Sequence, residues 1–243
     1  MSGLVGLWRV LCALVHLMHG MLICLVEFPF LDPAARMRRV GWWSARMLRM
    51  LGVALAHEGT PRGGSTLVVA NHVSWLDILA INAVQPARFV SKADVRDWPL
   101  IGWLVACGGT LFIERERKRD ALRVVHQVAD ALKQGQTIAV FPEGTTSEGH
   151  ALLPFHANLL QAAVSTGTPI QPVALRFSDD REAVSLAAAY VGDTDLLRSV
   201  WSVVTAPRLR VKVRWLESVG TRHADRRALS DTLRERILAA LGS

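Results

Sequence analysis

One short stretch of this chain limits the possible folds more than any other. Residues 66–70, TLVVA, are apolar and mostly β-branched, which is typical of a buried strand. His72 and Ser74 follow within four residues, and residues 78–84, ILAINAV, then form a second apolar stretch. We expect Ser74 to cap a helix there, with Asp77 in its first turn. A buried strand that passes through a short turn into a helix predicts an α/β fold.

The same stretch contains a candidate pair for proton transfer. His72 would follow the carboxyl end of a buried strand, and Asp77 would lie at the start of the next helix. Folds of the α/β class bind their ligands at this edge of the sheet. An aspartate that accepts a hydrogen bond from a histidine fixes its tautomer, so the pair can act as a general base. These residues alone leave a second interpretation open, in which Asp77 only stabilises the helix dipole.

The N-terminus predicts a helix that associates with a membrane. Residues 10–26 carry no charged side chain, and about 17 residues is the lower limit for a helix that spans a bilayer. A cleaved signal peptide is not expected, because Arg9 lies inside the apolar stretch and no small-residue cleavage site follows. Pro29 and Pro33 should end the helix.

Residues 34–51 predict a second helix of different character, in which arginines alternate with methionine, valine and tryptophan. The arginines are Arg36, Arg38, Arg39, Arg46 and Arg49. A basic amphipathic helix with tryptophans is typical of a segment in the membrane interface, and its arginines favour the cytoplasmic side. The alternative is that the apolar face packs on the domain. We predict a membrane-binding helix pair in residues 1–51 and a globular domain in residues 52–243.

Composition narrows the classes of partner. Lysine and arginine outnumber aspartate and glutamate by 28 to 21, which gives a net charge of +7, and 51% of the residues are hydrophobic. Nucleic acid and anionic lipid are the usual partners of a basic chain. The apolar N-terminus favours lipid over nucleic acid. Three scattered cysteines (Cys12, Cys24 and Cys107) predict neither a disulfide framework nor a zinc site, so we expect no metal and a reducing compartment.

From residue 53 onward, strand and helix patterns alternate, which predicts one α/β domain. Strands are expected at residues 53–59, 66–70, 87–92, 108–115, 137–141, 169–177, 187–191 and 209–217. Helices are expected at residues 78–84, 98–107, 116–135 and 152–167, with two more near Leu196 and from Asp225.

Four stretches carry a resemblance to a known family: NHVSWLD (71–77), LFIER (111–115), FPEGTTS (141–147) and PIQPVAL (169–175). In order and spacing they resemble the glycerolipid acyltransferase family, whose bacterial type member is 1-acyl-sn-glycerol-3-phosphate (lysophosphatidate) acyltransferase. The resemblance implies a glycerol-3-phosphate acyltransferase-like mixed α/β sheet flanked by helices. It also implies transfer of an acyl group from a thioester to a glycerol hydroxyl, which gives phosphatidate for phospholipid biosynthesis.

The resemblance implies that His72 is the catalytic base and Asp77 its partner. No covalent acyl-enzyme is needed, because the acceptor hydroxyl is itself the nucleophile. Ser74 is expected to cap its helix rather than to attack, since the chain has no G-x-S-x-G nucleophile elbow.

Five further residues match the binding motifs of the family. By resemblance, Arg115 and Lys92 would contact the acceptor's phosphate, which suits cations at strand ends. Glu143 would orient the acceptor's glycerol. Gly144 and Thr145 would continue a loop whose backbone N–H groups can bind an anion. Pro172 matches a fourth motif, for which a purely structural role is favoured.

One departure from the family pattern leaves the acceptor open. Many members carry an arginine where this chain has Thr146, and a small hydroxyl residue there resembles the branch that acylates lyso-ornithine lipid. We therefore expect lysophosphatidate as the acceptor, with lyso-ornithine lipid as the alternative. A membrane-anchored hydrolase and a lipid-binding module without activity are alternatives of other classes.

The remaining expectations concern partners and the other histidines. The acyl donor would be an acyl carrier protein or coenzyme A thioester, with no other cofactor. The protein would lie at the bacterial inner (cytoplasmic) membrane with its catalytic domain on the cytoplasmic side. His156 is expected to face the site, whereas His16, His19, His126 and His223 are expected at the membrane interface or in solvent.

Overall fold

A mixed seven-stranded sheet forms the centre of the protein, as expected. The computed structural model describes residues 2–113 and 118–242. The strands lie in the order β1 (Ala54–Glu58), β7 (Arg210–Trp215), β6 (Ile170–Ser178), β2 (Thr66–Ala70), β5 (Thr137–Val140), β3 (Arg88–Lys92) and β4 (Leu111–Ile113). Strands β6, β2, β5, β3 and β4 are parallel to one another, whereas β7 runs antiparallel to β6, and β1 is parallel to β7. The carboxyl ends of β2, β5, β3 and β4 therefore share one edge of the sheet.

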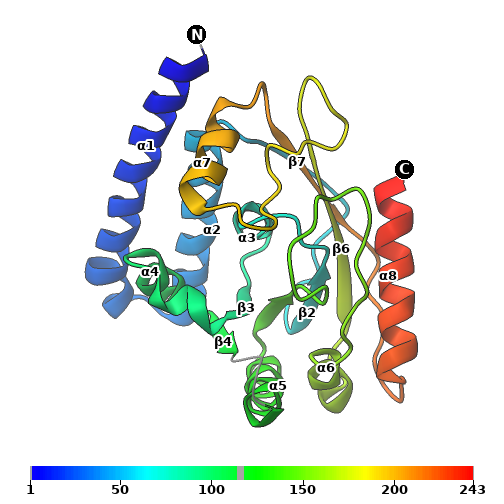
Figure 1. Ribbon diagram of the computed structural model, residues 1–243. Coiled ribbons are helices and arrows are strands. Elements are labelled where there is room, and N and C mark those ends of the chain that lie inside the picture. The colour runs from blue at the N-terminus through cyan, green and yellow to red at the C-terminus, as the bar shows by residue number, and fades with distance from the viewer. Residues whose placement is uncertain (1, 114–117, 243) are drawn as a thin grey trace.

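Helices cover both faces of the sheet. One face is covered by α2 (Pro33–Leu51), α3 (Leu76–Val84) and α7 (Leu196–Thr205), and the other by α5 (Lys118–Lys133), α6 (Leu160–Thr166) and α8 (Arg226–Gly242) (Figure 1). Because both faces are covered, the central strands are mostly apolar, and all five residues of β2 are buried. A shorter helix, α4 (Ile101–Cys107), follows a 3₁₀ turn at Ala93–Asp97.

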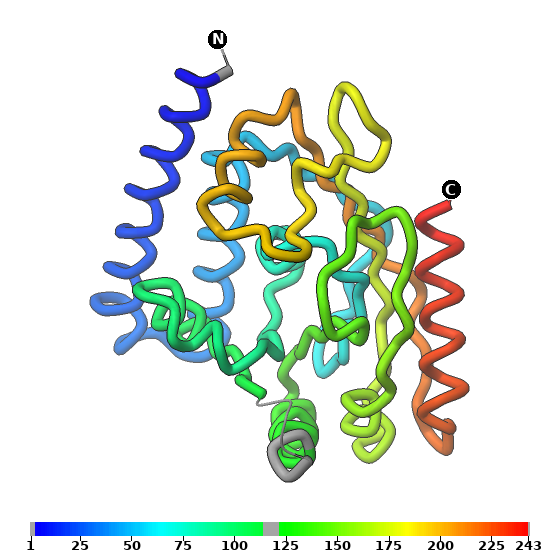
Figure 2. Tube along the Cα trace, viewed as in Figure 1, coloured from blue at the N-terminus to red at the C-terminus, as the bar shows by residue number. Residues whose placement is uncertain are grey.

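The apolar N-terminus forms a long helix that packs beside the domain. Helix α1 (Ser2–Leu22) continues through a π-helical turn (Ile23–Glu27) and a 3₁₀ turn (Phe28–Phe30) before α2 begins. Figure 2 follows the chain from α1 on one side of the molecule to α8 on the other. The segment from Gly3 to Phe30 is long and apolar enough to cross a membrane.

Contacts along α1 tie it to α2 and α7. The guanidinium of Arg9 donates to the carbonyl of Val204 over 2.8 Å. The Trp43 indole N–H donates to the carbonyl of His16, and the Nε2 atom of His16 lies 3.0 Å from the carbonyl of Trp43. The expectation that His16 faces the interface or solvent was wrong: its ring stacks on Trp43, and only 3% of the residue is exposed. Tertiary packing between two helices decides this burial.

Helix α2 has both a packed face and an exposed basic face. Met47, Leu48 and Leu51 are buried in the same core as the sheet, while the arginines point outward. The alternative interpretation, in which the apolar face of this helix packs on the domain, therefore holds for the face that carries Met47, Leu48 and Leu51. The division of the chain at residue 51 and membrane contact by α2 stay predictions.

Two expected elements differ in the structure: one helix is shorter than expected, and one strand is absent from the described residues. The helix expected at 152–167 is limited to α6, because the N–H groups of Leu153 and His156 donate to Glu143 and Pro142, and because Pro154 disfavours a helix before it. The strand expected at 187–191 is a turn whose Tyr190 N–H donates to the carbonyl of Val73. In both segments, contacts with distant residues replace the local hydrogen bonds that the pattern suggested.

Candidate active site

His72 and Asp77 meet at the carboxyl end of β2. The Nδ1 atom of His72 lies 2.8 Å from Oδ2 of Asp77, and the Asp77 side chain is fully buried. The same oxygen accepts the backbone N–H groups of Val73 (2.7 Å) and Ser74 (2.9 Å). Three donors thus hold one carboxylate oxygen, and a proton on Nδ1 completes this network.

The other ring nitrogen of His72 is available for chemistry. Nε2 has no hydrogen-bond partner among residues 2–113 and 118–242, and the His72 side chain is 19% exposed. With the proton on Nδ1, Nε2 presents its lone pair away from Asp77. This is the arrangement that a general base needs.

Ser74 does not cap the helix with its side chain, which corrects the sequence-based expectation. Its hydroxyl is buried and has no partner in the described structure, and the residue before α3 is Trp75. Only half of a capping box forms, in which Asp77 accepts the N–H of Ser74. The Asp77 carboxylate that binds His72 thus also accepts a backbone N–H group just before α3. A fully buried hydroxyl is also unsuited to nucleophilic attack.

An aromatic ring supports the imidazole, a feature that sequence reasoning missed. Phe141 stacks on His72 with ring centroids 3.9 Å apart and planes 7° from parallel, and Phe89 stacks in turn on Phe141. Phe141 follows β5, the neighbour of β2, so the sheet order brings it to His72. The sequence feature that could have indicated this role of Phe141 is its position directly before Pro142 and Glu143 in the third motif.

Asn71 joins the end of β2 to β6. Its side-chain amide donates to the carbonyl of Leu175 (2.9 Å), and its amide oxygen accepts the N–H of Leu175 (2.7 Å). The residue is buried and directly precedes His72. Asn71 thus positions the histidine from the other side of the turn.

Glu143 holds the backbone of His72. One carboxylate oxygen accepts the N–H of His72 (2.7 Å) and the other accepts the N–H of Leu153 (2.9 Å). Burial raises the pKa of the Glu143 carboxyl, and the two N–H donors partly oppose that rise. Each oxygen thus accepts one backbone N–H group of the protein, which holds the turn around His72, and the expected contact of Glu143 with the acceptor's glycerol stays a prediction.

Replacing Glu143 with glutamine should lower kcat at least about tenfold and leave KM for both substrates nearly unchanged. Glutamine can accept only one of the two N–H groups, so the other is left facing an NH₂ group, at a cost of about 1–3 kcal/mol. Steady-state kinetics and urea unfolding would measure both effects. Glu148→Gln, an exposed residue of the same loop, is the matched control. A Glu143→Gln variant with altered KM and unchanged kcat would instead indicate direct contact with substrate.

The loop after Glu143 is tied to the turn that carries the histidine. Gly144 has a positive φ of 75°, a conformation that glycine adopts without strain. The N–H of Ser147 donates to the carbonyl of His72 (2.9 Å), and the Thr146 hydroxyl donates to the carbonyl of Tyr190. Thr145 is exposed. Thr146 is thus used inside the protein, which sequence reasoning did not foresee.

The other expected site residues lie at the same sheet edge or outside the described structure. Lys92 is exposed at the end of β3, separated from β2 by β5. Arg115 lies outside the described residues. His156 is exposed in the loop before α6 rather than in a helix. Pro172 pairs with Val69 of β2, just before the β6–β7 pairing begins, which fits a structural role.

Comparison with known proteins identifies the family. Residues 55–176, which include β2, the His72–Asp77 pair and the loop after β5, match the family described as Acyltransferase. The chain belongs to the acyltransferase family. It is therefore an O-acyltransferase of lipid metabolism, with a lipid acceptor and an acyl donor as the substrates that the family implies.

Two bacterial relatives of this acyltransferase are named for different acceptors. It is 36% identical to the lyso-ornithine lipid O-acyltransferase of Pseudomonas aeruginosa over 85% of this chain and 79% of that one. It is 35% identical to the 1-acyl-sn-glycerol-3-phosphate acyltransferase of Neisseria gonorrhoeae over 79% of this chain and 75% of that one. The fold matches the crystal structure of the 1-acyl-sn-glycerophosphate acyltransferase of Thermotoga maritima with a TM-score of 0.76 at 22% identity, covering 100% and 97% of the two chains.

Proposed function

We propose that the protein transfers an acyl chain from a thioester to the free hydroxyl of a lysolipid, with His72 as the general base. The observation that carries this proposal is the geometry of His72: Nδ1 is bound to the buried Asp77, and Nε2 is left for substrate. The stacked Phe141 keeps the ring of His72 in place, and the hydrogen bond from the His72 N–H to Glu143 keeps its backbone in place.

The proposed reaction proceeds in two stages on these groups. The acceptor hydroxyl oxygen attacks the thioester carbonyl carbon while its proton passes to Nε2 of His72. Asp77 stabilises the imidazolium that forms, as the aspartate of a catalytic triad does. The tetrahedral intermediate then expels the thiolate, which takes the proton from His72 and leaves as a thiol.

We propose lysophosphatidate as the acceptor and phosphatidate as the product. A phosphate monoester carries close to two negative charges at neutral pH and needs strong donors. Lys92 ends β3, and the neighbouring strand β4 ends two residues before Arg115 in the sequence, at the same edge of the sheet as β2. The similarity to the Neisseria gonorrhoeae 1-acyl-sn-glycerol-3-phosphate acyltransferase supports this choice.

Lyso-ornithine lipid is the second candidate acceptor. Thr146 replaces the arginine that many relatives carry, so one cation for a phosphate is missing. Its hydroxyl is also bonded to Tyr190, away from any role in binding a phosphate. The similarity to the lyso-ornithine lipid O-acyltransferase of Brucella abortus, 30% identical over 100% of this chain and 96% of that one, favours the same acceptor.

A direct comparison of acceptors would decide between the two. The purified enzyme in detergent would be offered lysophosphatidate, lyso-ornithine lipid and lysophosphatidylglycerol with one acyl thioester. We expect lysophosphatidate to be acylated fastest, and Arg115→Ala to raise KM for it about tenfold while the donor's KM stays nearly unchanged. Lys133→Ala is the control, because Lys133 lies before β5, at the opposite edge of the sheet. Turnover of lyso-ornithine lipid without turnover of lysophosphatidate would assign the protein to the second class.

We also propose that α1 binds the cytoplasmic membrane, with the catalytic domain on the cytoplasmic side. Most apolar side chains on its outer face are exposed, among them Leu4, Leu7, Leu11, Leu14, Met18 and Leu22. The exposed arginines of α2 lie beside this surface and can interact with anionic headgroups, each contributing about 1 kcal/mol.

A double substitution on the outer face of α1 should release the protein from membranes. Leu14 and Met18 are 55% and 58% exposed, so Leu14→Asp with Met18→Asp should fold but lose most binding to vesicles of phosphatidylcholine and phosphatidylglycerol. Leu122→Asp, at a residue of α5 that is 61% exposed, is the matched control. Vesicle sedimentation at low and high salt measures the effect. Equal sedimentation of the double variant and the control would contradict membrane binding through α1.

A further inference from the structure

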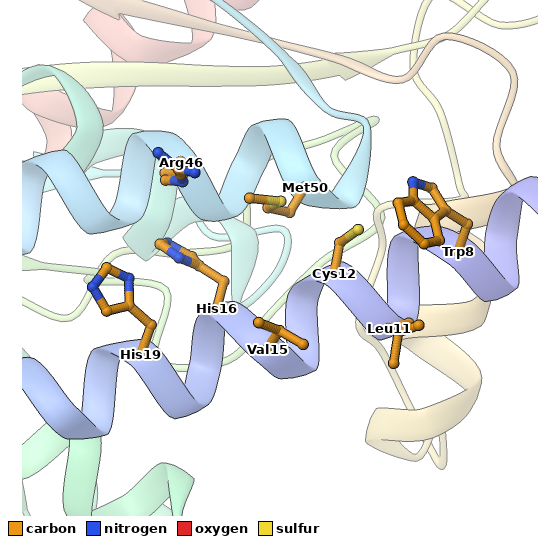
Figure 3. Close-up of a pocket in the computed structure, with 8 residues that line it drawn as sticks. All are labelled: Trp8, Leu11, Cys12, Val15, His16, His19, Arg46 and Met50. Carbon is orange, nitrogen blue, oxygen red and sulfur yellow. The ribbon is translucent and has the colours of Figure 1, made fainter.

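A groove runs between α1 and α2, outside the active site. It has a volume of about 360 Å³ and is lined only by residues of these two helices (Figure 3). Its two ends differ in chemistry. Trp8, Leu11, Val15 and Met50 line the apolar part, whereas His19 and Arg46 lie together towards the other end. None of the proposed catalytic or substrate-binding residues lines the groove, so its ligand is a separate question.

The polar end carries a positive charge without a carboxylate partner. Arg46 is exposed, and within the described part of the chain its guanidinium forms no ion pair. It lies over the ring of Trp42, 5.6 Å from the centroid. On the same helix, Arg39 differs from Arg46 in that its guanidinium is paired with Glu27 over 2.7 Å. The guanidinium of Arg46 can donate to an anionic group from the medium.

The two histidines at this end have different roles. His16 is buried, and its Nε2 is engaged with the carbonyl of Trp43, so it belongs to the contact between the helices. His19 is exposed, with its ring centroid 5.7 Å from those of both His16 and Trp42. His19 can therefore hydrogen-bond to a ligand that Arg46 holds.

The apolar wall has the length of a lipid chain. Trp8 and His19 are eleven positions apart in the sequence, which corresponds to about 16 Å along the helix, close to the roughly 15 Å of hydrocarbon in one bilayer leaflet. Trp8, Leu11 and Val15 are 65%, 52% and 63% exposed, so a ligand would cover apolar surface that is otherwise open. A small soluble anion would leave this wall uncovered.

We propose that the groove binds one anionic phospholipid, with its phosphate at Arg46 and His19 and one acyl chain along the apolar wall. The headgroup supplies the missing negative charge, and the chain buries Leu11 and Val15. A zwitterionic phospholipid brings a second cation to the polar end, so it binds less tightly. This lipid is neither acceptor nor donor but a bound component of the helix pair.

Native mass spectrometry of the full chain in non-ionic detergent, titrated with phosphatidylglycerol, tests the proposal. We expect one retained lipid on the wild type and about tenfold weaker retention by Arg46→Gln. Arg46→Lys should restore part of the affinity, because a lysine keeps the charge but not the planar fork. Arg227→Gln, at an exposed arginine of α8 outside the groove, is the control and should retain lipid as the wild type does.

A second pair of variants tests the binding of the acyl chain at the apolar end of the groove without altering the charge of the protein. Val15→Asn should weaken retention several-fold, whereas Leu122→Asn, at an exposed residue of α5 outside the groove, should not. The unfolding temperature of each variant checks its fold. Equal retention of phosphatidylcholine, equal loss in Arg227→Gln, or equal binding of glycerol 3-phosphate would each overturn the proposal. Displacement of phosphatidylglycerol by one equivalent of palmitoyl coenzyme A would overturn it in favour of a donor site.

Discussion

Replacing His72 with alanine should lower kcat at least about a hundredfold. The acceptor hydroxyl loses its proton as it attacks, and Nε2 of His72 is the proposed acceptor of that proton. Alanine removes this base, while the backbone bond from the His72 N–H to Glu143 remains available. Folding should therefore survive, and the loss should appear in kcat rather than in binding of the two substrates.

Steady-state kinetics at saturating acceptor and donor would measure this loss, with circular dichroism and urea unfolding as checks on the fold. His156→Ala is the matched control, because His156 is exposed in the loop after the third motif and its side chain forms no described hydrogen bond. We expect the control to retain most of the activity. A His72→Ala enzyme that keeps more than a tenth of wild-type kcat would exclude His72 as the essential base.

Replacing Asp77 with asparagine should lower kcat about as much as replacing His72 with alanine, for a different physical reason. Asparagine is nearly the same size and can still present one oxygen to Nδ1 of His72 and to the N–H groups of Val73 and Ser74. It removes the negative charge that stabilises the imidazolium, and an amide can hold the wrong tautomer. In a comparable triad such a change lowers kcat about 10⁴-fold, so we expect a loss of at least a hundredfold.

This substitution should also reduce stability. The second oxygen of Asp77 is buried without a partner in the described structure, so the NH₂ group of asparagine would lie there unsatisfied. Such a buried donor costs about 1–3 kcal/mol, which urea unfolding can measure. Asp130→Asn, at an exposed aspartate of α5, is the control. If Asp77→Asn stayed within threefold of wild-type kcat, the charge of Asp77 would have no part in catalysis.

Local sequence determined the parts of this protein that depend on neighbours in the chain. The apolar, β-branched residues 66–70 become β2, and the apolar N-terminus becomes one long helix. His72 and Asp77 are five residues apart across a single turn, so their contact follows from local geometry. The order of the four family motifs, which the match over residues 55–176 supports, is likewise a property of the linear chain.

Only the tertiary structure decided the contacts between distant segments. Glu143 lies 71 residues from His72, and its carboxylate accepts the backbone N–H groups of His72 and Leu153. Thr146 reaches Tyr190 across 44 residues, and His16 is buried because α1 packs on Trp43 of α2. The loop before α6 and the turn at 187–191 contain helix-like and strand-like patterns, yet their N–H groups bond elsewhere. Propensity and periodicity describe a residue's near neighbours, whereas burial and hydrogen bonding are completed by whichever distant groups the strand order brings close.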